Sequence, residues 1–580
     1  MIRKLAKSIR EYKTPSIITM LLMVGEVVIE CLIPFITADL VNDIKAGVEL
    51  SELLKTGLIL VALAVVSLSC GGIAAYTCSK ASAGFAKNLR HDVFTRILKF
   101  SFQNIDKYST SSLVTRLTTD ITHVQMSYMM IIRTAIRSPL MFVLAIIMAY
   151  KMGGSLATTF VVVVPVLIFG LLLVARTAMP AFRRVFMIYD RLNESIEENV
   201  RAMRVVKGFS REKYETKKFT NAATDICKDF TKAERIVALN GPIMQICMYF
   251  NMIFVLIVGS RLTISSKGAL LDVGQISAML TYGMQILMAL MMLSMIYVML
   301  TMSMESMKRI CEVLDEEPNL HNPKNPIYTV KDGSIDFNNV NFKYSKTACR
   351  NSLSNIDLHI KSGMTVGVIG GTGSGKSSLV QLIPRLYDVT DGDVLVGGID
   401  VREYDIKTLR DSVAMVLQKN QLFSGTIKDN LRWGNENATD EEMIKACQLA
   451  QADDFIKSFP DGYDTYIEQG GTNVSGGQKQ RLCIARALLK KPKILILDDS
   501  TSAVDTKTDA FIRAGFKEYI PETTKIIIAQ RVASVMDADM IIVMENGKVA
   551  AVGNHDELIK NSEIYREVYE QQTNGGDFDE

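Results

Sequence analysis

The sequence contains no Cys-x-x-Cys pair, although nine cysteines are scattered along its 580 residues. Such scattering argues against a disulfide framework or a zinc site and is typical of reduced thiols in a cytosolic or membrane setting. A strong excess of one charge is also absent, because the formal net charge at pH 7 is only +3. Bulk electrostatics therefore give no reason to expect a nucleic-acid partner. The length calls for two or more domains.

Long apolar runs are nearly absent after about residue 305, whereas the part before it holds six of them. Spanning the hydrocarbon core of a membrane takes roughly 20 residues, and most of these runs reach that length. The third run is short unless it includes flanking residues. We therefore predict a six-helix transmembrane domain over residues 1–305, with its helices at approximately 16–41, 56–78, 138–152, 155–178, 240–262 and 274–300.

The placement of Lys and Arg predicts the orientation in the membrane. The leader MIRKLAKSIREYK and the long segments 80–137 and 176–235 are basic, whereas the other connectors are short. The positive-inside rule then places both termini in the cytoplasm, as in a multi-pass protein of the cytoplasmic membrane. The first apolar run is too long for a signal-peptide core and shows no evident cleavage site, so we expect it to be retained.

Two stretches within the basic segments, residues 86–106 and 191–219, have the pattern of amphipathic helices. We expect the transmembrane helices to extend into the cytoplasm there. These extensions are either solvated charged helices or elements that carry motion to a cytoplasmic domain.

The character of the chain changes from about Met304. A polar segment with Pro318, Pro323 and Pro326 predicts a linker over residues 306–330. Beyond it, strand-like apolar runs alternate with helical patterns. This alternation predicts a cytosolic α/β domain with a largely parallel sheet over residues 331–580.

A phosphate-binding loop follows the strand-like run MTVGVIG and precedes the helical run SLVQLIPRL. The pattern G-x-x-x-x-G-K-[ST] in this context predicts ATP or GTP binding, because glycine amides and a helix N-terminus can surround phosphate oxygens. Lys376 can reach the β- and γ-phosphates, and the Ser377 hydroxyl can bind Mg²⁺. The alternative is a glycine-rich turn without function. The predicted binding residues are Gly370, Gly371, Thr372, Gly373, Ser374, Gly375, Lys376, Ser377 and Ser378.

A second nucleotide motif is the run PKILILD, which ends in Asp498. An acid at the carboxyl end of a strand is suited to holding Mg²⁺ beside a phosphate loop. The alternative is that Asp498 merely caps the next helix.

The stretch VSGGQKQR, Val474–Arg481, resembles the signature motif of ABC transporters, usually written LSGGQ. The resemblance covers the whole chain, which looks like a half-exporter: six transmembrane helices fused to one nucleotide-binding domain. It implies that Tyr344 stacks on adenine, that Gln418 belongs to the Q-loop and the Mg²⁺ shell, and that Asp505 belongs to the D-loop. It also implies head-to-tail dimers in which each signature motif contacts the partner's ATP, here through Ser475, Gly476, Gly477 and Gln478.

The chain departs from this family at two positions. The family's usual sequence L-D-E-A-T-S-A-L-D has a glutamate as general base where this chain has Asp499. Aspartate is one methylene shorter, which retracts the carboxylate by roughly 1.5 Å. Gln530 stands where the family has a switch histidine, and glutamine cannot take up a proton near neutral pH.

Two such changes predict a site that binds ATP but hydrolyses it slowly, with Asp499 and Gln530 as weak catalytic residues. Because the signature motif is intact and serves the partner's phosphate loop, we expect a heterodimer with a second half-transporter. It then resembles the heterodimeric multidrug-type exporters of bacteria, which have one degenerate and one competent site. The alternative is a slow homodimer.

The resemblance also predicts short coupling helices near Ser109–Arg116 and Arg201–Phe209. The methionine-rich sixth span, residues 284–304, suits a cavity for varied apolar compounds, although plain core or lipid-facing packing is the alternative. Glu26 and Glu30 share one helix face. They either attract cationic substrates into a wet cavity or pair with a neighbouring helix or with the partner.

We expect ATP-driven export of hydrophobic or amphipathic compounds, which include small molecules, lipids and peptides. A homodimeric lipid or lipopeptide flippase and an ATP-gated regulatory or channel-like subunit are the alternatives. No protease-like domain precedes the first predicted helix, which argues against a leader-processing exporter.

Overall fold

The computed structural model describes residues 1–580 except 267, 268, 270, 346, 347, 500–505 and 575–580. It separates into two compact units. The first unit comprises Met1–Leu98 and Ser109–Glu316, and the second comprises Lys99–Tyr108 and Glu317–Glu580. Asp505 lies outside the described residues.

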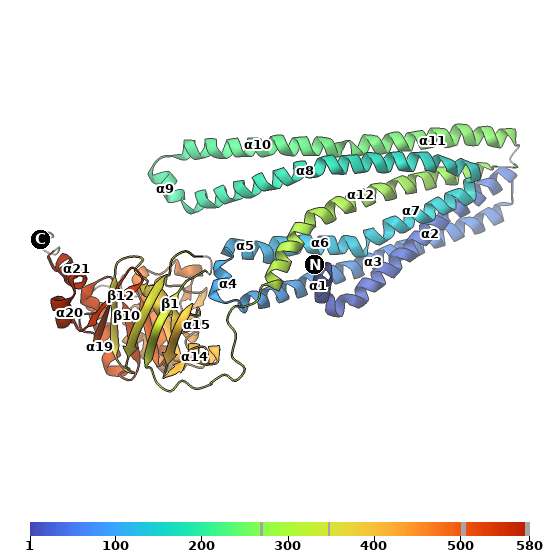
Figure 1. Ribbon diagram of the computed structural model, residues 1–580. Helices are drawn as coiled ribbons and strands as arrows, with labels where there is room; N and C mark the ends of the chain where they lie inside the picture. The colour runs from blue at the N-terminus through green and yellow to red at the C-terminus, as the bar shows by residue number, and fades with distance from the viewer. Residues whose placement is uncertain (267–268, 270, 346–347, 500–505, 575–580) are drawn as a thin grey trace. The chain divides into compact units, whose positions relative to one another are not determined.

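The first unit is helical throughout its described residues (Figure 1). Its α-helices are α1 (Ile2–Leu5), α2 (Lys13–Ala46), α3 (Leu50–Leu98), α5 (Thr110–Thr115), α6 (Ile121–Ile132), α7 (Thr134–Gly153), α8 (Thr159–Arg201), α9 (Met203–Gly208), α10 (Glu212–Ala238), α11 (Asn240–Ser265) and α12 (Val273–Asp315). Three short helical turns join them: η1 (Ala6–Tyr12), η2 (Arg116–Asp120) and η3 (Gly154–Thr158).

The six predicted spans lie in α2, α3, α7, α8, α11 and α12. By length and apolar composition, the described residues contain five continuous helical stretches that could cross a membrane. One of these, Thr110–Ala181, includes α7 and the first part of α8, because only η3 separates the two helices. The chain reverses direction there (Figure 1), at Gly154, whose φ of +48° favours glycine. The predicted class, a helical domain with membrane-spanning helices followed by an α/β domain with a largely parallel sheet, is confirmed.

The long helices pack through small side chains. α2 lies along α3 and α7, while α12 lies along α2, α7 and α11. A Cβ atom on Gly274 of α12 would lie only 2.0 Å from the carbonyl oxygen of Ala38 in α2. Such close backbone approach is how transmembrane helices gain packing contact without a hydrophobic driving force between them.

The helix α12 ends at Asp315, so residues 306–315, which we predicted to be linker, are helical. Ile310 and Val313 are buried, and Arg309 Nε donates to Asp120 Oδ2 at 2.8 Å. This apolar spacing and ion pairing keep the helix intact well beyond the apolar run on which the prediction rested.

The two acids of α2 are engaged by a neighbouring helix. Arg137 Nη2 of α7 lies 2.7 Å from Glu30 Oε1 and 3.6 Å from Glu26 Oε1. Glu26 is buried, and Gln285 of α12 donates to the backbone oxygen of Glu30 at 3.2 Å. These contacts match one of the roles considered for Glu26 and Glu30, namely pairing with a neighbouring helix.

The second unit contains the short helix α4 (Phe102–Asp106) and an α/β domain. The helices of that domain are α13 (Lys376–Leu382), α14 (Ile406–Ser412), α15 (Ile427–Arg432), α16 (Asp440–Leu449), α17 (Asp453–Lys457), α18 (Gly476–Leu489), α19 (Thr506–Tyr519), α20 (His555–Asn561) and α21 (Glu563–Asn574). Its short turns are η4 (Gly462–Asp464), η5 (Gln469–Gly471) and η6 (Val532–Ser534).

A six-stranded sheet forms the centre of this domain in the order β12-β11-β3-β10-β9-β6. Its members are β3 (Thr365–Gly370), β6 (Val413–Val416), β9 (Ile494–Asp498), β10 (Thr524–Ile528), β11 (Met540–Glu545) and β12 (Lys548–Gly553). All neighbours are parallel except β12, as the buried apolar strands predict.

The smaller sheets are antiparallel. One has the order β2-β1-β4-β5, formed by β1 (Ile335–Phe342), β2 (Leu353–Ile360), β4 (Asp391–Val396) and β5 (Ile399–Asp400). The other pairs β7 (Gly425–Thr426) with β8 (Tyr466–Ile467).

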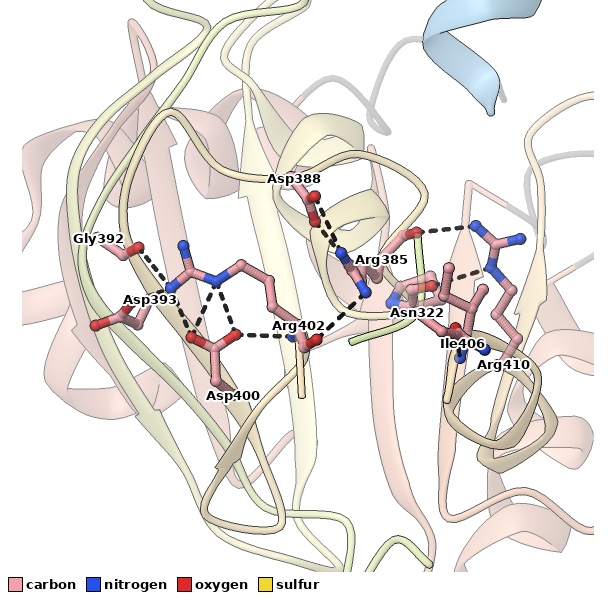
Figure 2. A network of polar contacts seen from close by, with 10 residues as sticks. Asn322, Arg385, Asp388, Gly392, Asp393, Asp400, Arg402, Ile406 and Arg410 are labelled. Atoms are coloured by element: carbon pink, nitrogen blue, oxygen red, sulfur yellow. Dashed lines mark hydrogen bonds and ion pairs between the residues drawn. The ribbon is translucent and has the colours of Figure 1, made fainter. Parts of the chain in front are cut away.

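A network of ion pairs fixes the turns between α13 and α14 (Figure 2). Arg402 Nε lies 3.0 Å from both carboxylate oxygens of Asp400. Arg385 Nε donates to Asp388 Oδ1 at 2.8 Å, and the Arg385 side chain is buried. The Arg385–Asp388 pair closes the turn that carries Tyr387, so this ring is held in a defined place.

Candidate functional site

Four sequence motifs meet at one edge of the central sheet. The phosphate loop follows β3, Gln530 follows β10, Asp498 and Asp499 lie at the end of β9, and Gln418 follows β6. These four strands are parallel neighbours, so their carboxyl ends lie side by side. Ligands of open α/β sheets bind at this edge.

The phosphate loop has the geometry that its glycines allow. Gly375 precedes α13 with a φ of +97°, and a Cβ there would lie 2.9 Å from Leu353 Cδ2. Only glycine fits such a position without strain. Lys376 Nζ donates to the carbonyl oxygens of Gly370 and Gly371 at 2.8 and 2.9 Å. Burial lowers the pKa of Lys376 although nearby Asp498 and Asp499 act against the shift.

The loop residues fit a bound nucleotide phosphate. Ser374 is buried, and its Oγ atom has no hydrogen-bond partner among the described residues. A buried hydroxyl without a partner is costly, so a phosphate oxygen is a natural complement. Ser377 Oγ donates to Asp498 Oδ1 at 3.1 Å, which places two oxygen ligands of the kind that Mg²⁺ prefers next to each other.

Asp498 carries a charge that the fold itself does not favour. Burial is the main cause that raises the pKa of this carboxyl above its usual range, and the Ser377 hydrogen bond only partly offsets it. The ionised form therefore destabilises the metal-free protein, and this penalty grows as the pH rises through the folded-state pKa. We expect Asp498→Asn to raise the melting temperature of the nucleotide-free protein at pH 8.

The gain from Asp498→Asn should shrink as the pH is lowered, because the wild-type carboxyl then takes up a proton itself. Thermal melts between pH 8 and pH 5 without Mg²⁺ or ATP measure both effects. A variant that melts below the wild type at pH 8 would refute this assignment of an unfavourable buried charge.

Asp499 is held by two amides. Gln530 Nε2 and Gln418 Nε2 donate to the same oxygen, Asp499 Oδ2, at 2.8 and 3.2 Å. These hydrogen bonds occupy the lone pairs of one of the two carboxylate oxygens and lower the basicity of the group as a base for water. Asp499 also has a φ of +48°, a conformation that aspartate adopts more readily than most residues.

Gln572 of α21 is a residue that the sequence did not bring to attention. Its Nε2 donates to the backbone oxygen of Gln530 at 2.8 Å, and its Oε1 accepts from the Val532 amide at 2.8 Å. It fixes the backbone beside Gln530 and so orients that side chain. Nothing in the local pattern of an exposed terminal helix indicates this role.

Tyr344 lies beside the phosphate-loop helix. Ser378 Oγ and Tyr344 Oη are 2.8 Å apart, and Tyr344 Oη donates to Gln381 Oε1 at 3.1 Å. Burial raises the pKa of this phenol. Ser378 is one of the predicted phosphate-binding residues, and the phenol contacts its hydroxyl directly.

The helix α4 packs on this tyrosine. Tyr387 Oη donates to Asp106 Oδ2 at 2.7 Å, while the rings of Tyr387 and Tyr344 meet edge to face with centroids 5.1 Å apart. Gln103 Nε2 donates to the Tyr344 carbonyl at 3.3 Å. Contacts therefore run without a break from α4 to the nucleotide site.

The stretch near Ser109–Arg116, predicted to be a coupling segment, lies next to a shorter helix, α4, in the chain. That stretch, mainly α5, belongs to the first unit, whereas α4 belongs to the second. Ser101 caps α4, with its Oγ accepting from the Asn104 amide at 3.3 Å. The spacing of Ser101 and Asn104 is a capping signal that marks this helix. The other predicted segment, Arg201–Phe209, contains the helix α9 within the first unit.

We expect Tyr344→Phe to tighten ATP binding about fivefold, because the hydroxyl bonded to Ser378 is lost while the ring that the family resemblance predicts to stack on adenine remains. Tyr344→Ala should weaken binding about tenfold or more, since base stacking on an aromatic ring is lost. Titration with a fluorescent ATP analogue measures both. Weaker binding by the phenylalanine variant would mean that the hydroxyl aids the nucleotide instead of competing with it.

The signature residues form a capped helix N-terminus. Ser475 Oγ accepts from the Gln478 amide at 3.3 Å, and Gln478 Oε1 accepts from the Ser475 amide at 2.9 Å. Ser475 and Gly476 are exposed at the start of α18. Among the described residues, no hydrogen bond joins Ser475–Gln478 to the phosphate loop. The structure therefore brings the other four motifs together and leaves this one apart.

Comparison with known proteins decides the family. Residues 16–290 match the family described as the ABC transporter transmembrane region, and residues 353–502 match the family described as ABC transporter. The ABC transporter ATP-binding protein YfiB of Bacillus subtilis is 34% identical over 570 residues, which cover 98% of both chains. This chain belongs to the ABC transporter family.

Other members of the ABC transporter family match as completely. The ABC transporter ATP-binding protein Rv1273c of Mycobacterium tuberculosis is 34% identical over 574 residues and 98% of both chains. The structure of a bacterial Atm1-family ABC exporter with ATP bound superimposes with a TM-score of 0.83 at 24% identity, covering 97% of this chain and 98% of that one. The fold is thus that of an ABC exporter, and the α/β domain is an ATP-binding domain whose ATP hydrolysis drives transport.

Proposed function

We propose that this chain is the subunit of a heterodimeric ABC exporter that contributes the weaker ATP site, while its signature motif completes the stronger site on the partner. The observation that carries the proposal is the double hydrogen bond from Gln418 and Gln530 to Asp499 Oδ2. A carboxylate that is both one methylene short and already hydrogen-bonded is a poor base for water.

The size of the expected defect follows from geometry. A general base must come within about 2.6–3.2 Å of the proton it takes, and a misplacement on the order of 1 Å can cost about a hundredfold in rate. Gln530 adds a second defect, because an amide cannot carry the positive charge that a histidine offers beside a γ-phosphate. Binding is unaffected, since Lys376, Ser377 and Asp498 keep their geometry.

The partner follows from the signature motif. Ser475 and Gly476 retain the capped and exposed helix N-terminus that suits a γ-phosphate on another chain. An intact signature motif and a weak base can occur in one chain when the motif contacts the partner's ATP and the base acts on this chain's own ATP. In a homodimer, both ATP sites would combine an intact signature motif with the weak base, so both would hydrolyse ATP slowly.

The proposed substrate class is based on the exposed methionines of α12. Met284, Met288, Met292 and Met295 are exposed and recur at helical spacing along one face of this helix. Flexible methionine side chains adapt to apolar molecules of different shape. We propose that these methionines face the transport path and that Mg²⁺ accompanies ATP in its site. We also propose that both termini and the ATP-binding domain are cytosolic, because export across the cytoplasmic membrane draws its ATP from that side.

ATP hydrolysis in proteoliposomes tests the proposal. This chain alone should turn over slowly, and one particular half-transporter co-expressed with it should co-purify and raise the rate about a hundredfold. Brisk hydrolysis by this chain alone, with no partner retained, would favour a homodimer with competent ATP sites.

A further inference from the structure

An apolar cavity of about 500 Å³ lies in the first unit against the N-terminal segment α1–η1. Leu5 and Ile9 of this segment line it together with Phe85 of α3, Val124 of α6 and Met304 of α12. Ligand pockets of small molecules span about 300–1,000 Å³, so the cavity has room for a sizeable apolar group.

Polar contacts hold the segment in place over the cavity. Lys4 forms an ion pair with Asp315 of α12. Arg10 Nη2 lies 2.5 Å from Asp92 Oδ1 of α3, and Ser8 Oγ donates to Asp92 Oδ2 at 2.7 Å. The segment is thus tied to two different helices, and the space beneath it is a built feature of the bundle.

The polar groups of the lining define what the cavity accepts. Besides Lys13, only Ser16 and Tyr128 line it with polar side chains. Their hydroxyls are 2.6 Å apart, and Ser16 Oγ also donates to the Tyr12 carbonyl at 2.7 Å, so both are satisfied. The exposed Lys13 forms no hydrogen bond or ion pair with any residue that the structure describes. The interior therefore suits hydrocarbon, and Lys13 offers a cation at its edge.

The predicted start of the first span places this cavity at the expected edge of the membrane. Residues 1–13 contain five Lys and Arg, whereas the first predicted span begins at Ser16. A basic segment with apolar residues on one face is typical of helices that lie in the membrane interface. Anionic headgroups attract such segments by about 1 kcal/mol per basic residue.

We propose that this cavity binds one acyl chain of an anionic phospholipid, whose headgroup phosphate pairs with Lys13. The residues that line this cavity belong to the first unit, whereas the ATP site belongs to the second. A lipid chain there would pack between the N-terminal segment and α12.

Lipid retention by the full chain tests the proposal. The detergent-purified protein is incubated with phosphatidylglycerol or with phosphatidylcholine of the same acyl chains, and bound lipids are counted by native mass spectrometry. We expect about fivefold preference for phosphatidylglycerol, and Lys13→Glu should abolish it. Lys7→Glu is the matched control, because Lys7 is exposed on the same segment but does not line the cavity.

Filling the cavity tests the acyl-chain part. Ala6→Trp should reduce retention of both lipids several-fold, and if that variant does not fold, the comparison of Lys13→Glu with Lys7→Glu still decides. Equal retention of the two lipids by the wild type, or equal loss in the two lysine variants, would overturn the proposal. Retention of oleate without retention of phosphatidylglycerol would identify a free fatty acid instead and overturn it as well.

Discussion

A Gly476→Asp substitution in this chain is expected to lower ATP hydrolysis by the assembled heterodimer about hundredfold, whereas Asp499→Asn should change it by less than about twofold. The aspartate would present a negative charge where the signature amides meet the partner's γ-phosphate. It should not disturb folding, because an acidic residue in the first turn of α18 interacts favourably with the helix dipole.

The control for this pair is Gly476→Ala, which adds a side chain at the same exposed position without charge and suits a helix. It should retain most of the activity. Steady-state hydrolysis by the purified pair measures all three variants. A large loss with Asp499→Asn would show that this chain's own site carries the turnover, and the asymmetric assignment would then be wrong.

The double substitution Asp499→Glu with Gln530→His should raise hydrolysis by this chain alone about hundredfold. Glutamate restores the missing reach of roughly 1.5 Å, and histidine replaces the amide that occupies Asp499 Oδ2. Asp499→Glu by itself should give only a few-fold increase, since Gln530 would still donate to the carboxylate.

Hydrolysis by the chain reconstituted at high density in proteoliposomes measures this gain. Asp499→Glu with Gln530→Ala is the matched control, because it frees the carboxylate without supplying an imidazole. A hundredfold increase in ATP hydrolysis from Asp499→Glu alone would show that side-chain reach is the only defect and that Gln530 does not limit the rate.

The sequence predicted the motifs that meet at one edge of the sheet, because each motif is local. The phosphate loop, Asp498 and Gln530 each follow an apolar strand, and parallel strands bring their carboxyl ends to one edge. Each of these residues could be assigned to its motif from the local sequence alone. Their mutual contacts could not, since the hydrogen bonds from Gln418 and Gln530 to one oxygen of Asp499 depend on side-chain placement.

Features that depend on contacts between residues far apart in the chain could not be predicted from the sequence. The pairing of Glu30 with Arg137 joins residues more than a hundred positions apart, and no local pattern indicates it. The docking of α4 on Tyr387 was missed for the same reason, because a helix of five residues has almost no periodicity to detect. The end of α12 was misplaced because burial against η2 extends it past the apolar run.

The most direct test of the asymmetric ATP sites is the chemical state of the nucleotide held by this chain during turnover. A radiolabelled azido-ATP can be photo-crosslinked in the proposed heterodimer, where we expect the adenine at Tyr344 of this chain and at the corresponding position of the partner. After separation of the two subunits, we expect intact ATP on this chain and mainly ADP on the partner. Equal amounts of ADP on both subunits would contradict a slow site here.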